Sequence, residues 1–366
     1  MLEIKASQTV KEGSIFGQIS SMDHEQLVVC HDEATGLKAL IGIHNTTLGP
    51  ALGGTRMWPY ATEEEAITDV LRLSRGMTFK NALAGLNLGG GKAVIIGDPK
   101  LKNEAFLRRF GRFVQSLGGR YVTAEDVNMK TSDMEYIAME TKHVTGLPEI
   151  KGGGGDPSPV TAYGTYMGMK AAAKKAFGSD SLSGKKICVQ GVGQVGKYLI
   201  EYLIKEGAEV LITDIFEDKL KKVALDTGAV AIDPNLIYDM DMDIYAPCAL
   251  GATINDDTID RLKCAVIAGG ANNQLKDEAK QGQILLEKGI IYAPDFLINA
   301  GGVINVGAEY FGGYNREIVY KQAEKIYDTC LYILNKSEKE NIPAQQAAIE
   351  AAKERINAIG RVKLSF

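Results

Sequence analysis

The sequence is poor in the side chains that build metal and disulfide sites. Its 366 residues include five cysteines and four histidines, and no two cysteines form a CxxC pair. Scattered residues of these types do not have the ligand spacing of a structural metal site, so we expect no bound metal. An odd number of cysteines without motif spacing is typical of reduced cytosolic thiols. We therefore expect a cytoplasmic protein.

Long apolar runs and blocks of like charge are also absent. No stretch approaches the length of a membrane span, and residues Met1–Lys5 lack the apolar core of a signal peptide. The formal net charge is -5 and no basic block stands out, which argues against a nucleic-acid partner. With 45% hydrophobic and 24% charged residues, the composition is that of an ordinary globular protein. The length is comfortable for two domains.

The first 147 residues predict a mixed-sheet α/β domain. Apolar stretches on both sides of a polar turn at Asp32–Gly36 predict an antiparallel hairpin over residues 26–46. After the hairpin, the spacing of apolar residues predicts helix 63–75, strand 93–96, helix 103–117 and strand 121–124. Residues 131–133 (Thr-Ser-Asp) offer capping side chains for a further helix.

Residues 147–159 break this pattern. The run Gly152–Pro159 is rich in glycine and proline, so it continues neither a helix nor a central strand. We interpret the segment as a domain hinge, and a flexible surface loop is the alternative. Ser158 followed by Pro159 is a good N-cap and N1 pair, which predicts a long helix that ends near Phe177.

Beyond the hinge, strands and helices alternate, which predicts a parallel, doubly wound sheet of Rossmann type. The strands are expected at 186–190, 209–213, 243–246 and 265–268, and the helices at 194–206 and 216–227. Residues 315–360 predict two helices separated near Asn341–Pro343.

The expected fold class is therefore α/β with two domains and a cleft between them. Residues 148–330 contain a dinucleotide fingerprint at Gly191–Gly196 and would therefore form the NAD-binding domain. Residues 1–147 would then form the substrate-binding and catalytic domain. The C-terminal helices, from about residue 331 to residue 366, would pack back on the first domain.

A complete dinucleotide fingerprint lies in the second domain. A strand leads directly into the turn Gly191-Val192-Gly193-Gln194-Val195-Gly196, from which a helix opens. The glycines permit a tight turn, close approach of the backbone to a pyrophosphate and close packing of the helix, while the helix N-terminus offers amides to phosphate. Asp214 ends the next strand, where a carboxylate accepts hydrogen bonds from ribose hydroxyls and repels a 2′-phosphate, so NAD is favoured over NADP. An ordinary βα turn and a solvated turn acid are the alternatives.

Two lysines and an acid in the first domain suggest redox chemistry on a small carboxylated molecule. Lys80 ends the motif MTFK, Lys92 ends the motif GGGK, and Asp126 follows the end of a strand. The glycine run is not a phosphate-binding loop, because Leu86 stands where that motif needs glycine and a strand follows it. A lysine whose pKa is lowered by burial or by a neighbouring cation is a competent general base. The alternatives are surface charges for the lysines and a capping or loop acid for Asp126.

Several motifs closely resemble those of the Glu/Leu/Phe/Val dehydrogenase family. They are the run Leu48–Trp58 (LGPALGGTRMW), the two lysine motifs, Thr123–Val127 (TAEDV) and Asn299–Val306 (NAGGVINV). The similarity covers nearly the whole chain, and motifs of this length are highly specific. Within the family, the chain resembles the leucine-specific members.

This resemblance implies a role for each residue of the site. Lys80 would hold the substrate α-carboxylate, and Lys92 would be the base that activates water. Asp126 would assist proton transfer around the amino group. Gly53 would pack beside the substrate, and Asn273 would touch nicotinamide or substrate.

The resemblance also implies an apolar side-chain pocket, formed by Leu52, Ala124, Val303 and Val306. Glutamate-specific relatives place a lysine and a serine near two of these positions, so the apolar set argues against a glutamate side chain, whose buried charge would lack partners. Ala124 leaves less room than glycine, which favours an aliphatic over an aromatic substrate by about 1–3 kcal/mol.

One departure from the family pattern adjoins Asp126. Asn128 stands where many leucine-specific relatives have glycine, and the following Met129-Lys130 is also unusual. This loop therefore bears on substrate preference.

The activity that the resemblance implies is reversible, NAD-dependent oxidative deamination of leucine, valine or isoleucine to the 2-oxo acid and ammonia. Phenylalanine dehydrogenase activity is one alternative, and a catalytically silent NAD-binding protein is another. Because relatives form homo-oligomers, often octamers, the resemblance also implies a homo-oligomer.

Overall fold

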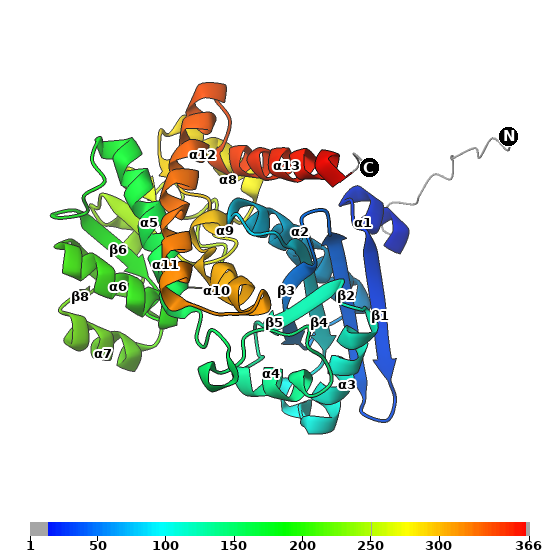
Figure 1. Ribbon diagram of the computed structural model, residues 1–366. Helices are drawn as coiled ribbons and strands as arrows, with labels where there is room; N and C mark the ends of the chain where they lie inside the picture. Colours follow the sequence, from blue (N-terminus) through cyan, green and yellow to red (C-terminus); the bar gives the residue numbers. More distant parts are fainter. Residues whose placement is uncertain (1–13, 250, 364–366) are drawn as a thin grey trace, which may run out of the picture. The chain divides into compact units, whose positions relative to one another are not determined.

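A computed structural model describes residues 14–249 and 251–363 of the chain, which divides into two compact units (Figure 1). The first unit runs up to Thr78 and resumes over Asn87–Leu147. The second unit comprises Phe79–Leu86 and the chain from Pro148 onward. The chain therefore passes between the units at three places.

The first unit is built on a mixed five-stranded sheet with the order β1-β2-β4-β3-β5. Strands β1 and β2 form an antiparallel hairpin, β2 pairs antiparallel with β4, and β3 pairs parallel with β4 and β5. The strands are β1 (Gln26–Asp32), β2 (Leu37–Asn45), β3 (Ala51–Trp58), β4 (Gly89–Ile96) and β5 (Tyr121–Glu125). The helices are α1 (Ile15–Ser21), α2 (Glu63–Leu83), α3 (Glu104–Ser116) and α4 (Thr131–Ala138). The predicted hairpin and the mixed strand directions are confirmed.

Alternation of side chains along the strands divides this unit into two apolar layers. In β4, Ala93 and Ile95 pack into a cluster with α3 and α4, whereas Val94 packs into a cluster with α2. Successive strand residues point to opposite faces, so Lys92 lies on the same face as Val94, the face covered by α2.

Glycines bring α2 unusually close to the sheet. A Cβ atom on Gly90 would lie 2.0 Å from Oγ1 of Thr78, and one on Gly42 would lie 3.0 Å from Oγ of Ser74. The missing side chains therefore let the helix backbone approach the strands. His44 fixes the same contact, because its Nδ1 lies 2.7 Å from Oγ1 of Thr78.

Three predictions for this unit need correction. The strand expected at 93–96 begins at Gly89, so the three glycines are the first residues of β4 rather than a loop before it. The helix expected to end at Arg75 continues to Leu83 and carries Lys80 in its last turn. Strand β3 was not expected as a strand, because it too contains adjacent glycines, which have low strand propensity.

The second unit contains a six-stranded, wholly parallel sheet with the order β11-β10-β9-β6-β7-β8. Its strands are β6 (Lys186–Gln190), β7 (Glu209–Thr213), β8 (Val230–Ala231), β9 (Ile244–Pro247), β10 (Val266–Ile267) and β11 (Ile291–Tyr292). The chain order reverses between β6 and β9, which is the arrangement of doubly wound dinucleotide-binding folds. The predicted Rossmann-type sheet is confirmed.

Helices connect these strands and continue beyond them. They are α5 (Ser158–Phe177), α6 (Gln194–Glu206), α7 (Glu217–Thr227), α8 (Glu278–Glu287), α9 (Asp295–Ile298), α10 (Gly301–Tyr310), α11 (Arg316–Glu324), α12 (Ile326–Glu340) and α13 (Ala344–Lys363). The break near residues 341–343 is confirmed, but the first of the two predicted helices is divided at Lys325. Ser158 is the first residue of α5 rather than its N-cap, and its N–H donates to Asp156.

The C-terminal helix contacts the part of α2 that belongs to the second unit. Arg355 of α13 donates to the carbonyl oxygens of Ala82 at 2.7 Å and Leu86 at 2.9 Å. The bond to Ala82 occupies a carbonyl group in the last turn of α2, where helices leave acceptors without intrahelical partners, and the bond to Leu86 lies just beyond the helix.

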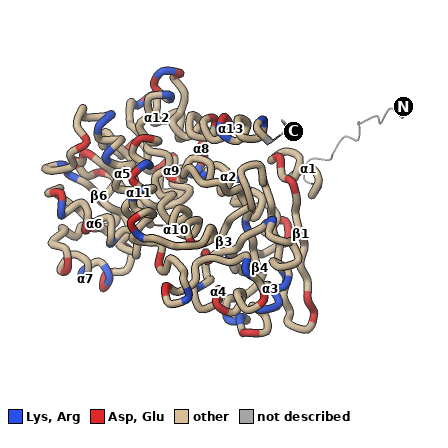
Figure 2. Tube along the Cα trace, viewed as in Figure 1, with Lys and Arg blue, Asp and Glu red and all other residues tan. Residues whose placement is uncertain are grey.

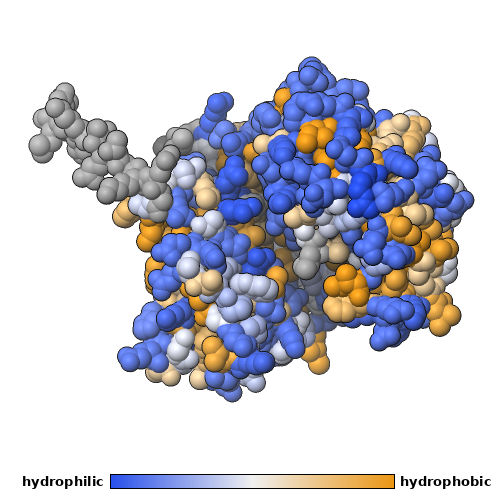
Figure 3. All heavy atoms as spheres, turned by 180° about the vertical axis from the view of Figure 1, so that it is seen from behind, coloured by the Kyte–Doolittle hydropathy of each residue, from blue (hydrophilic) through white to orange (hydrophobic). Residues whose placement is uncertain are grey.

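Charges of both signs are interspersed along the chain (Figure 2). The face seen in Figure 3 is mainly hydrophilic, with hydrophobic side chains in small groups. Within the described residues, no helix is both long enough and apolar enough to cross a membrane, and the five cysteines are free. No group of three or more His, Cys, Asp or Glu side chains in residues 14–249 and 251–363 could hold a metal ion.

Candidate active site

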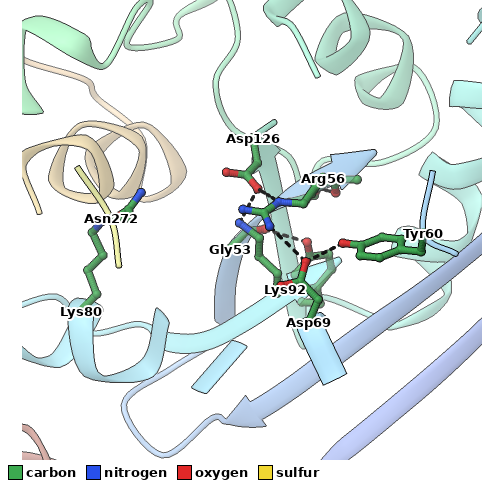
Figure 4. Close-up of polar contacts among 11 residues, drawn as sticks. Gly53, Arg56, Tyr60, Asp69, Lys80, Lys92, Asp126 and Asn272 are labelled. Carbon is green, nitrogen blue, oxygen red and sulfur yellow. Dashed lines mark hydrogen bonds and ion pairs between the residues drawn. The ribbon is translucent and has the colours of Figure 1, made fainter. Parts of the chain in front are cut away.

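In the first unit, Lys92 and Asp126 form an ion pair. Nζ of Lys92, on β4, lies 2.8 Å from Oδ2 of Asp126, which directly follows β5 (Figure 4). The Lys92 side chain is only 7% exposed, whereas that of Asp126 is 24% exposed. The structure thus brings together two of the predicted catalytic side chains, one buried and one within reach of solvent.

Asp126 also contacts Arg56, a residue that the sequence did not single out. Nε of Arg56 lies 3.2 Å from the same oxygen, Oδ2. Burial alone would raise the pKa of Asp126, but the charges of Lys92 and Arg56 outweigh it and hold this pKa below its ordinary value. Asp126 is therefore ionised at neutral pH.

The register of the sheet places apolar residues beside this pair. Leu52 pairs with Gly90, and Ala124 pairs with Gly54. Paired residues of parallel strands share a face, and alternation puts Leu52, Ala124 and Lys92 on the face that α2 covers. Leu52 is 1% exposed and Ala124 is 5% exposed.

Two glycines of β3 leave no room for side chains. A Cβ atom on Gly53 would lie 1.7 Å from the carbonyl oxygen of Gly91, and one on Gly54 would lie 2.9 Å from Cβ of Asp126. The carbonyl oxygen of Gly53 also accepts a 2.7 Å hydrogen bond from the Tyr121 hydroxyl. The paired glycines therefore fix where Asp126 can lie.

In the second unit, the last turn of α2 presents Lys80 to Asn272. The Lys80 ammonium donates to Oδ1 of Asn272 at 3.5 Å (Figure 4). Nδ2 of Asn299 donates to the same oxygen at 2.7 Å. The predicted Asn273 lies next to this group, with a left-handed backbone (φ 52°) that asparagine tolerates.

The other predicted pocket residues of this unit lie on one helix. Val303 and Val306 are buried on α10, and their spacing of three puts them on one side of it. Asn305 of the same helix donates to the carbonyl oxygen of Gly154 at 3.3 Å. This contact ties the glycine-rich segment after Pro148 to the second unit.

The fingerprint turn has a shape that fits a dinucleotide. Gly191 has φ 103°, which suits glycine, and a Cβ atom on Gly196 would lie 2.1 Å from the carbonyl oxygen of Gly191. A Cβ atom on Gly193, in contrast, would meet no atom of the described residues within 4 Å, apart from its own chain neighbours. The backbone there borders open space at the start of α6, where helix amides favour phosphate. Val192 is buried, while Gln194 and Val195 open the helix.

Asp214 follows β7 beside this turn. Its carboxylate accepts hydrogen bonds from the backbone N–H groups of Val192 at 2.8 Å and Phe216 at 2.9 Å. A carboxylate has about four lone-pair sites, so two of them remain for ribose hydroxyls.

Comparison with known proteins identifies the family. Residues 24–143 match the dimerisation domain of Glu/Leu/Phe/Val dehydrogenases, and residues 152–214 and 212–362 match the Glutamate/Leucine/Phenylalanine/Valine dehydrogenase domain. The chain belongs to the Glu/Leu/Phe/Val dehydrogenase family.

Several members of the Glu/Leu/Phe/Val dehydrogenase family are similar over nearly their full length. Leucine dehydrogenase of Bacillus subtilis strain 168 is 58% identical over 353 residues, which is 96% of each chain. Leucine dehydrogenase of Thermoactinomyces intermedius is 57% identical over the same share of both chains. Among solved structures, L-tryptophan dehydrogenase from Nostoc punctiforme has a TM-score of 0.84 at 44% identity and covers 94% of this chain and 99% of its own.

The structure explains how this Glu/Leu/Phe/Val dehydrogenase accommodates Asn128. Asn128 has φ 61°, a left-handed conformation that favours glycine and tolerates asparagine. Its side-chain amide donates to the carbonyl oxygen of Met57 at 3.0 Å, and Nζ of Lys102 donates to the carbonyl oxygen of Asn128 at 2.7 Å. Asn128 therefore keeps the left-handed turn and adds a side-chain hydrogen bond to β3. Met129 is buried, and its N–H donates to the carbonyl oxygen of Asp126.

Proposed function

We propose that this chain catalyses the reversible, NAD-dependent oxidative deamination of branched-chain L-amino acids to 2-oxo acids and ammonia. The observation that carries this proposal is the pair of Lys92 and Asp126 on the sheet face that also bears Leu52 and Ala124. The 56–58% identity to leucine dehydrogenases supports the same reaction.

In this proposal, each residue of the site has one role in the reaction. Lys80 binds the α-carboxylate, which fixes the orientation of the α-carbon. The fingerprint turn would hold NAD+, which would accept the hydride from the α-carbon. Lys92 removes a proton from the water that attacks the resulting imine, and Asp126 exchanges protons with the departing amino group. Gly53 and Asn273 pack against the substrate and the nicotinamide.

The proposed preference for leucine, valine and isoleucine rests on the character of four buried residues, which are Leu52, Ala124, Val303 and Val306. None carries a charge or a hydroxyl, so a second substrate carboxylate would be buried without a partner. Aromatic amino acids are harder to exclude than glutamate, because an apolar pocket can discriminate against an aromatic side chain only by its size.

We also infer the cofactor and the assembly. Asp214 favours NAD, because its negative charge opposes the 2′-phosphate of NADP. The match to a dimerisation domain supports a homo-oligomer, for which we propose an octamer. We further propose a cytoplasmic location, because the five cysteines of the chain are free and thiols stay reduced in the cytoplasm.

A substrate panel tests the proposal. With NAD+, absorbance at 340 nm should rise with leucine, valine or isoleucine, and kcat/KM for these should exceed that for phenylalanine and glutamate. A higher kcat/KM for phenylalanine would favour phenylalanine dehydrogenase. NADH binding without amino-acid-dependent reduction would indicate a silent NAD-binding protein.

A further inference from the structure

Arg56 shares the carboxylate of Asp126 with Lys92. Both cations contact the same oxygen, Oδ2, with Nζ of Lys92 at 2.8 Å and Nε of Arg56 at 3.2 Å (Figure 4). The arginine approaches from β3 and the lysine from β4, so the acid is held from two neighbouring strands. The acid consequently has a second cationic partner.

Arg56 is itself fixed by an anchor outside the catalytic pair. Its NH1 atom lies 3.0 Å from Oδ2 of Asp69 on α2, and the Tyr60 hydroxyl donates to the same Asp69 oxygen at 2.5 Å. Arginine presents its donors in a rigid planar fork, so two carboxylates on two sides determine its orientation. The arginine side chain is 24% exposed, which means that most of it is packed.

Charge balance shows what this arrangement supplies. When Lys92 is protonated, the cations Lys92 and Arg56 balance the anions Asp126 and Asp69. A general base must lose and regain a proton in each turnover. If Lys92 were the sole partner of Asp126, its deprotonation would leave a largely buried carboxylate without a cation, which is costly. With Arg56 in place, Asp126 keeps a cation throughout.

We propose that Arg56 is a positioning residue that holds the Asp126 side chain in place and keeps a cation beside it while Lys92 gains and loses its proton. The expected effect on kinetics rests on the proposed function. The pairing of Arg56 with Asp126 does not depend on that function. The titratable and charged groups around Asp126 are Lys92 on β4, Arg56 on β3, Tyr121 on β5 and, through Arg56, Asp69 on α2 and Tyr60.

The experiment compares Arg56→Gln, which removes the cation, with Arg56→Lys, which keeps one. In Arg56→Gln, Asp126 keeps one of its two cationic partners among the described residues, and that partner, Lys92, holds its proton more firmly. The pH at which kcat reaches half its maximum should therefore rise by about one unit, a tenfold change in proton binding. KM for leucine should stay nearly constant, because Arg56 does not touch the substrate in this proposal. Arg56→Lys should recover most of the original pH profile.

Arg109→Gln is the matched control. Arg109 is also a partly exposed arginine of the first unit, paired with Asp32 at 2.8 Å. Its loss removes an ion pair of similar length that does not include Asp126 or Lys92, and it should leave the pH profile unchanged. If Arg56→Gln and Arg109→Gln have the same pH profile as the original protein, the inference is wrong.

A second measurement reads the pairing without catalysis. Titration of the Asp126 carboxyl by carbon-13 NMR should show a higher pKa in Arg56→Gln than in the original protein and in Arg56→Lys. An unchanged titration would overturn the inference. A protein that lacks leucine-dependent NADH formation but shows the shifted titration would instead reject the proposed function alone.

Discussion

Asp126 combines burial, charge and a contact with the proposed base in one side chain. Its pKa lies below the ordinary value of 3.8 because the cations Lys92 and Arg56 outweigh the effect of burial. A carboxyl whose pKa is lowered on folding stabilises the folded state fully at pH values above its unfolded pKa. This stabilisation is lost as the pH falls through the lower, folded pKa.

The exchange Asp126→Asn should therefore have a pH-dependent cost. At pH 7 we expect the free energy of unfolding to fall by about 2 kcal/mol, less than the 3–5 typical of a buried pair, because this side chain is partly exposed. Below about pH 4 the difference from the original protein should shrink, since the acid itself becomes neutral. Urea unfolding between pH 3 and pH 7 measures this. A difference that stays constant over that range would show that the ion pair does not contribute.

Two charged residues of the site could be predicted from the sequence, whereas the contact of Arg56 with Asp126 could not. Lys92 and Asp126 could be selected as candidates because motifs frame them. Arg56 lies in an equally well marked motif, but its partner Asp126 is 70 positions away along the chain. The contact exists only because β3 and β5 are paired in register, which no local pattern encodes.

At the scale of elements, the contact between α2 and the sheet depends on absent side chains. A Cβ atom on Gly90 of β4 would lie 2.0 Å from Oγ1 of Thr78 on α2. A Cβ atom on Gly76, which also belongs to α2, would meet no described atom outside its own helix backbone and chain neighbours within 4 Å. Lys80 follows Thr78 by two residues, so the seating of α2 on the strands also determines where this lysine lies.

Gly90→Ala and Gly76→Ala should therefore change stability in opposite directions. Gly90→Ala forces the helix away from β4, and overpacking of this kind costs about 1–3 kcal/mol. Gly76→Ala improves helix propensity without a clash and should stabilise the protein by up to about 1 kcal/mol. Thermal unfolding of both variants measures the effects. Equal changes in melting temperature would contradict the close contact.

The elements also differ in how well the sequence predicted them. Strands β6 and β7 match their predicted bounds, because parallel buried strands are continuous apolar runs with sharp ends. Strands β3 and β4 were missed or shortened, because their glycines serve close packing and conceal the strand pattern. The features that are hardest to predict are thus the ones that shape the catalytic face.

At the scale of the whole molecule, the proposed NAD site belongs to the second unit and the proposed base to the first. Ligand binding suppresses local opening of the structure that it contacts, by about 2.7 kcal/mol when the ligand concentration is 100 times Kd. NADH should therefore slow amide hydrogen exchange in the segments that it contacts, and this can be measured residue by residue.

Hydrogen exchange with and without NADH should map this effect. Amides of the fingerprint turn Gly191–Gly196 and the end of β7 should exchange about 100 times more slowly at that ligand concentration. Amides of the β1–β2 hairpin should be unchanged, because this hairpin belongs to the first unit. Protection of the hairpin without protection of the turn would contradict the assignment.

The central claim is that Lys92 is the base of an amino-acid dehydrogenase, and Lys92→Ala tests it most directly. With leucine and NAD+, kcat should fall by about 10²–10⁴-fold, which is the typical contribution of a general base. NADH affinity should be retained, and Lys38→Ala, a change at an exposed lysine of β2, should leave kcat unchanged. Normal turnover in Lys92→Ala would contradict the account.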